Sequence, residues 1–103
     1  MKTLLLSVAL LFCFPALSQN AIVHINAEFN KSNDWYGLKA VEGVKVYSGY
    51  LETNKSMQSR YNVTKVPTLI LYKDGEEVTR WEAGLDMKLH VTTKEVQHEI
   101  DRL

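Results

Sequence analysis

The chain has 103 residues, with 12 basic and 12 acidic side chains, and 46% of its residues are hydrophobic. This length allows one small domain with a hydrophobic core. The balanced charge gives no electrostatic reason to bind nucleic acid or an anionic membrane surface, so neither is predicted as a partner.

The first part of the chain, residues 1–18, has the pattern of a secretory signal peptide. Lys2 precedes an apolar run, Pro15 breaks it, and the small residue Ser18 precedes the predicted cleavage point. The run is too short to span roughly 30 Å of hydrocarbon, which disfavours an uncleaved anchor. We therefore expect an exported protein, periplasmic or secreted, without a membrane anchor after cleavage, whose single domain comprises residues 19–103.

The number of cysteines limits the chemistry of this domain. The sequence contains one cysteine, Cys13, and it lies within the predicted signal peptide. Disulfide exchange requires a thiolate, so the mature chain lacks the reactive group for it. Its stability must come from packing rather than from disulfides.

The first predicted elements form a strand-helix-strand unit. Residues 21–25 (AIVHI) are typical of a buried strand, and residues 44–51 (VKVYSGYL) predict a second one. Between them, Ser32 or Asn33 is a candidate N-cap for a helix that ends near Gly43. The connection is long enough for a crossover, so the two strands should be parallel neighbours.

The next predicted elements are a short helical piece and a β-hairpin. Met57 and Tyr61 have the spacing of one helical face. Residues 68–72 (TLILY) predict a third strand, and Asp-Gly at positions 74–75 favours a type I′ turn. The turn returns the chain along residues 77–83.

A final helix completes the pattern. Thr92 and Glu95 have the spacing of a capping box, and Val96, Ile100 and Leu103 form an apolar stripe. The order β-α-β-α-β-β-α predicts an α/β domain, with a four-stranded mixed sheet and helices on both faces.

Two segments of this pattern resemble the thioredoxin family, and the resemblance extends over residues 21–103. IVHINAEFNKSN is similar to the strand-turn-helix segment in which the family places its WCxxC motif. YNVTKVPTLILYKDGEEV is similar to the family's cis-proline loop and hairpin, with Val66-Pro67 as the cis bond. Gly84 also lies where the family usually has a glycine. The resemblance implies a minimal thioredoxin-like fold.

The residues at the family's redox positions differ. Asn30 and Asn33 replace the two cysteines, with Lys31 and Ser32 between them, and His24 corresponds to the buried acid that assists proton transfer. Asparagine is not a nucleophile, so we predict no catalytic residue and no dithiol oxidoreductase activity. A protein of the thiol-disulfide oxidoreductase family, involved in redox homeostasis, remains an alternative.

Each polar candidate has two interpretations. Asn30 and Asn33 either bind a ligand at a helix N-terminus or cap the helix. His24 is either a hydrogen-bonded core residue or a pH-sensitive group. The His, Asp and Glu residues lack the spacing of metal ligands, so neither a metal nor another cofactor is predicted.

The function favoured by these observations is binding. The resemblance implies that the Val66 backbone, before Pro67, pairs with an extended peptide. Phe29 and Trp35 are the predicted apolar contacts, with Trp35 facing partly outwards. We call residues 29–33 and 64–68 the former active-site face, and we expect it to bind a peptide or partner protein without redox activity. A structural or accessory subunit that docks elsewhere is the further alternative, and the sequence gives no oligomeric state.

Overall fold

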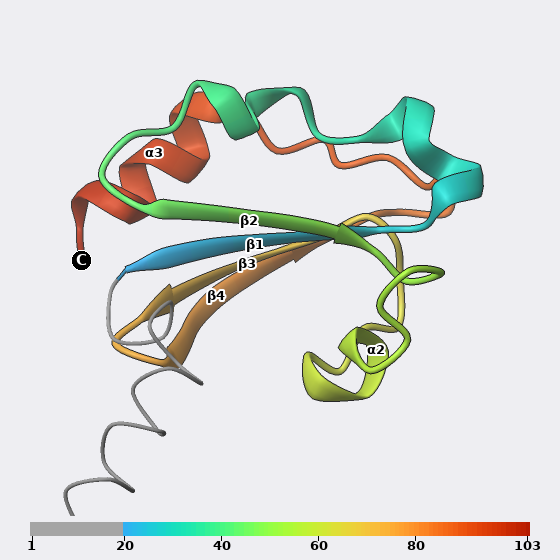
Figure 1. Ribbon diagram of the computed structural model, residues 1–103. Coiled ribbons are helices and arrows are strands. Elements are labelled where there is room, and N and C mark those ends of the chain that lie inside the picture. The colour runs from blue at the N-terminus through green and yellow to red at the C-terminus, as the bar shows by residue number, and fades with distance from the viewer. Residues whose placement is uncertain (1–19) are drawn as a thin grey trace, which may run out of the picture.

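The structure is a computed structural model, and it describes residues 20–103 (Figure 1). The predicted signal peptide, its cleavage point and Cys13 lie outside the described residues. Within the described part, none of the helices combines the length and the apolar character needed to cross a bilayer.

Four strands form one mixed sheet in the order β2-β1-β3-β4. They are β1 (Ala21–Asn26), β2 (Lys45–Tyr50), β3 (Thr68–Lys73) and β4 (Glu76–Glu82). β1 runs parallel to β2 and antiparallel to β3, and β3 and β4 form an antiparallel hairpin. The predicted α/β class and four-stranded mixed sheet are confirmed.

The hairpin has the turn that the sequence predicts. Asp74 and Gly75 have φ values of 50° and 85°, and two positive φ values characterise a type I′ turn. A register shift between Leu71 and Tyr72 marks a bulge in the strand pair. The peptide bond between Val66 and Pro67 is cis, as the family resemblance implies.

The final helix, α3 (Thr93–Asp101), is also as predicted. The Thr92 hydroxyl accepts the Glu95 backbone N–H at 3.1 Å, and the Glu95 carboxylate accepts the Thr92 N–H at 3.2 Å. Val96 and Ile100 are buried against the sheet. A short helix, α2 (Met57–Arg60), lies on the opposite side of the sheet (Figure 1).

The predicted first α-helix is wrong in detail. Its place is taken by two 3₁₀ segments, η2 (Glu28–Asn33) and η3 (Tyr36–Lys39). Within η2, Asn30 has φ −107° and ψ 18°, which is not helical. Short polar side chains compete with helical backbone bonds, and here the Asn26 amide donates to the Asn30 carbonyl while the Asp34 N–H bonds to Lys31 instead. Further along, the Trp35 ring packs so closely on Gly37 that an added Cβ would lie 2.5 Å from it.

Alternate residues of the strands point to two differently covered faces. The face towards α3, η2 and η3, called the α3 face, has a core of nine buried residues: Ile22, Trp35, Val41, Leu69, Leu71, Leu89, Val91, Val96 and Ile100. The opposite α2 face has a second buried cluster: Ala21, Val23, Ile25, Val63, Ile70 and Tyr72. In Figure 1 the α3 face has helical segments along its length, whereas α2 covers only one end of the other.

Candidate functional site

The end of the sheet at which β1 finishes brings the predicted site segments together. β1 ends at Asn26, and η2 begins at Glu28. Because Thr68 pairs with Ile25, the cis bond before Thr68 lies at this same end. The turn after β1 and the cis-proline loop are therefore neighbours, as the family resemblance implies.

An asparagine network occupies the position of the family's cysteines. Asn30 donates from its amide to the Asn26 side-chain oxygen at 3.1 Å and to the Met87 carbonyl at 3.0 Å. Its own side-chain oxygen accepts from Asn33 at 2.7 Å. Asn26 in turn donates to the Asn30 carbonyl at 2.9 Å and to Asp34 at 2.7 Å. The network ties the turn after β1 to residues 85–91.

This network gives Asn30 a structural role that neither interpretation of the asparagines predicted. Asn30 is only 5% exposed, and both of its amide donors are engaged within the chain. Its side chain therefore connects Asn26 to Met87 and has no amide donor left for a ligand. The capping interpretation is also wrong: Ser32 lies inside η2, and no side chain within residues 20–103 caps that segment.

His24 is fully buried beneath this network. Its Nε2 accepts the Trp35 backbone N–H at 3.1 Å, so the ring proton belongs on Nδ1, which lies 3.0 Å from the Ser48 hydroxyl. Burial lowers the His24 pKa below its ordinary value, and the nearby Asp34 carboxylate partly opposes this shift. This is the geometry of a neutral core histidine.

Sequence reasoning missed Asp34, Tyr50 and Met87 as members of this site. The Tyr50 hydroxyl donates to Asp34 at 2.5 Å, and this hydrogen bond raises the pKa of Tyr50. Tyr50 ends β2, so its approach to Asp34 follows from the parallel pairing with β1. No local motif in the sequence indicates either contact.

The aromatic residues at this site differ in exposure. Phe29 is 74% exposed, with Lys31 and Ser32 exposed beside it. Trp35, expected to face partly outwards, is only 4% exposed, because its indole N–H donates to the Val91 carbonyl at 2.9 Å and its ring joins the core. Phe29 is therefore the apolar group that this turn presents to solvent.

The cis-proline loop presents backbone groups. Pro67 is buried, and its carbonyl accepts the Ala83 N–H at 3.1 Å. Val66 is half-buried, and within residues 20–103 neither its N–H nor its carbonyl forms a hydrogen bond. These two groups are a donor and an acceptor that an extended chain can satisfy.

The site contains amides, hydroxyls, the Asp34 carboxylate and a neutral imidazole. Across residues 20–103, no group of three His, Cys, Asp or Glu side chains has the arrangement of a metal site. The described residues also contain no cysteine. The arrangement is suited to hydrogen bonding and apolar contact.

Comparison with known proteins supports the fold. A thioredoxin of Schistosoma mansoni aligns with a TM-score of 0.65 and 17% identity, covering 92% of this chain and 84% of that one. A mutant thioredoxin from Halobacterium salinarum aligns with a TM-score of 0.63 and 20% identity, covering 85% and 77%. Thioredoxin-2, a component of malaria parasite protein secretion machinery, aligns with a TM-score of 0.63 and 15% identity. The alignment covers 82% of this chain and 84% of that one.

The chain has a thioredoxin-like fold. No family model and no curated protein sequence matches it, and all three solved structures are less than 25% identical to it. The likeness therefore establishes the thioredoxin-like architecture and leaves the activity to be argued from the residues.

Proposed function

We propose that this chain is an exported, redox-inactive thioredoxin-like protein that binds an extended peptide or a partner protein through the former active-site face. The observation that carries the proposal is the Val66 backbone, whose N–H and carbonyl have no hydrogen-bond partner within residues 20–103. Strand-like pairing with a peptide uses these two groups and needs no thiol.

Phe29, in η2, is the second feature that favours binding at the former active-site face. An aromatic side chain that is 74% exposed is a typical anchor for a protein partner. The asparagine network holds the η2 turn beneath Phe29, so the anchor is presented from a fixed backbone. A preorganised surface loses less conformational entropy when a partner binds.

Redox inactivity is proposed from the residues at the thiol positions. Asn30 and Asn33 carry no nucleophile, and His24, which corresponds to the family's buried acid, has its Nε2 engaged by the Trp35 N–H. Insulin reduction by the purified exported chain tests this part of the proposal. Measurable dithiol turnover would contradict it and would favour the oxidoreductase alternative.

The binding proposal is tested by selecting unstructured peptides from a random library on the exported chain and measuring the affinity of those recovered. Phe29→Ser should lower the affinity about tenfold or more, as expected for loss of a hot-spot aromatic. Val78→Ser is the matched control, since Val78 is also exposed but lies on β4. Equal affinity in both variants would contradict a site at Phe29.

Export is tested separately by expressing the full chain in a double-membrane bacterium. The expected product is recovered from the periplasm or the medium, and its N-terminal sequence begins at Gln19. A cytoplasmic product that retains residues 1–18 would contradict export without affecting the binding proposal.

A role as an accessory subunit is the second candidate, and one observation favours it. Leu85 is fully exposed within residues 85–91, which form a loop beside the site. A native mass spectrum that shows a stable oligomer, lost in Leu85→Ser, would support this candidate over peptide binding.

A further inference from the structure

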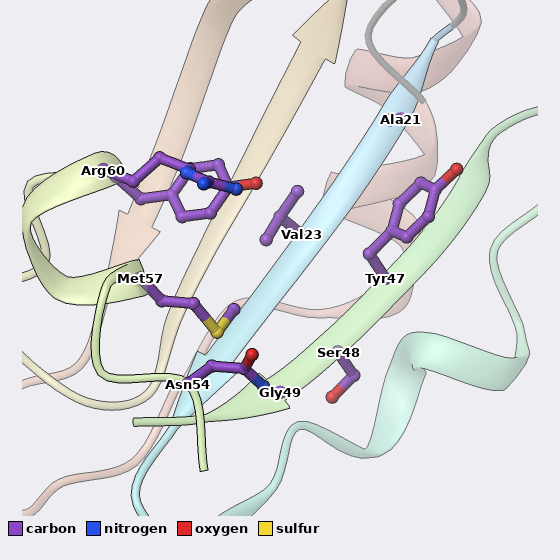
Figure 2. A pocket seen from close by; sticks show the side chains of 9 residues that line it. Ala21, Val23, Tyr47, Ser48, Gly49, Asn54, Met57 and Arg60 are labelled. Atoms are coloured by element: carbon purple, nitrogen blue, oxygen red, sulfur yellow. The ribbon is translucent and has the colours of Figure 1, made fainter. Parts of the chain in front are cut away.

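A pocket of about 250 Å³ lies on the α2 face, away from the former active-site face. Figure 2 shows it between α2 and β2, with β1 as its floor. Its main lining side chains are Val23, Tyr47, Met57, Arg60 and Tyr61, and Gly49 lines it with its backbone. Most of its lining is apolar, and Arg60 supplies one cationic group.

Gly49 allows Met57 to approach β2 closely beside this pocket. It occupies a strand position opposite Ile25, where a side chain would point to the α2 face. A Cβ added there would lie 3.1 Å from both the Sδ and the Cε of Met57. Glycine weakens a strand and often marks a place where another group approaches the backbone. The absence of a side chain at Gly49 therefore lets the Met57 side chain lie directly against β2 at the edge of the pocket.

Two tyrosines give the pocket aromatic walls. Tyr61 is fixed by an edge contact with Tyr72, with ring centroids 6.1 Å apart. Tyr47 extends from β2 on the opposite side and is 39% exposed (Figure 2). Ser48 alternates with it and points to the α3 face, where it meets His24. An apolar, ring-sized group therefore has contact surface on two sides.

Arg60 distinguishes this pocket from a purely apolar hollow. The chain has three arginines; Arg80 pairs with Glu77, and Arg102 pairs with Glu99. Within residues 20–103, Arg60 has neither an ion pair nor a side-chain hydrogen bond. Its side chain extends from α2 towards β1 at the pocket (Figure 2). The five donors of a guanidinium match a carboxylate in geometry and charge.

We propose that this pocket binds a small carboxylate with an apolar, ring-sized body, seating the body between Tyr47 and Tyr61 over Val23 and the carboxylate on Arg60. The size is suitable, since an apolar cavity of about 150 Å³ accommodates benzene and this one is larger. The combination of apolar walls and one placed polar group is that of small-molecule sites in general.

The probe for the test is 3-phenylpropionate, with its neutral amide, 3-phenylpropionamide, as the matched ligand control. Each is titrated into the isotope-labelled exported chain while backbone amide signals are followed by NMR. The carboxylate should produce saturable shifts at Val23, Tyr47 and Gly49. It should bind about tenfold more tightly than the amide, the ratio expected for one charge-assisted interaction.

Three variants test the roles of the residues. Arg60→Gln should remove the preference for the carboxylate, whereas Arg102→Gln should retain it. Gly49→Leu should displace the Met57 side chain into the pocket and abolish binding of both probes. Because Arg60 is exposed, its variant should remain folded even if Gly49→Leu does not. Phe29→Ser should leave probe binding unchanged, which separates this site from the peptide-binding proposal.

Several outcomes would overturn the proposal. They are the absence of saturable shifts at the pocket, equal affinity for the carboxylate and the amide, and an unchanged preference in Arg60→Gln. If the same signals instead shift with protein concentration when no probe is present, the pocket is covered by a second copy of the chain. That result also overturns the small-molecule site.

Discussion

The two faces of the sheet arise from alternating residues of the same strands, yet they are covered to different extents. The α3 face carries a nine-residue core under α3 and the 3₁₀ segments, and the asparagine network closes one end of it. The α2 face has a single helical turn over part of its length and retains a pocket with an unpaired Arg60 among the described residues. Both faces have buried residues, but the α3 face is covered along its length, whereas the α2 face leaves a pocket beside its buried cluster.

The largest expected effect tests which face carries the stability. Leu71→Ala removes a fully buried side chain from the α3 face and should lower the free energy of unfolding by about 3 kcal/mol. Met57→Ala, on the α2 face, should cost about 1 kcal/mol because Met57 is only half-buried. Urea unfolding of both variants measures the difference. Equal losses would remove the distinction between the faces.

The asparagine network gives the next largest effect. Asn30→Ala leaves the Asn26 oxygen, the Met87 carbonyl and the Asn33 amide without this partner. We expect a loss of about 2 kcal/mol, since unpaired buried polar groups are costly. Asn33→Ala, which removes one hydrogen bond from a half-buried residue, is the control and should cost less. A larger loss in Asn33→Ala would contradict the central role of Asn30.

A smaller effect tests the cover of the α3 face. Thr92→Ala removes the N-cap side chain of α3 and should cost about 1 kcal/mol, measured by thermal unfolding. Ser56 is the matched control because it precedes α2 without a side-chain cap bond. Ser56→Ala should therefore leave stability nearly unchanged, and a comparable loss there would show that the cap geometry is not the cause.

The smallest expected effect is the pH dependence that His24 confers. Its folded pKa is lowered by burial, from an ordinary value of 6.5, and Asp34 offsets part of this shift. Above pH 6.5 both folded and unfolded states are neutral at this residue. Below it the unfolded state binds the proton first, so stability falls as the pH drops towards the folded pKa.

His24→Gln should remove this component of the acid-induced fall in melting temperature, whereas His98→Gln, a change at an exposed histidine, should retain it. Melting temperatures measured on both sides of pH 6.5 test this expectation. If the wild type and His24→Gln lose stability in parallel, the buried imidazole is not the responsible group.

Features with a local cause could be predicted from the sequence. The turn at Asp74-Gly75 depends on two residues that tolerate positive φ, and the capping box depends on the three-residue spacing of Thr92 and Glu95. Strand boundaries were predicted to within a residue or so, because each apolar run ends at polar or turn-forming residues. The cis bond before Pro67 was inferred from family resemblance and not from local chemistry.

Features with a distant cause could not be predicted in this way. Where the sequence predicts an α-helix, the structure has 3₁₀ segments, and the Asn30 side chain in η2 bonds to the carbonyl of Met87, a residue far along the chain. Trp35 is buried, and its indole N–H donates to the carbonyl of Val91, which is again a distant residue in the sequence. Periodicity reports which side chains share a face, and it contains no information about such contacts.

The asparagine network also limits how this chain could change over evolutionary time. A cysteine at position 30 could not supply the two amide donors that now hold Asn26 and Met87. A cysteine at position 33 alone would be a single thiol beside an amide, without a partner for a disulfide. Acquiring a redox pair one residue at a time would therefore pass through a single-cysteine intermediate that has lost hydrogen bonds of this network.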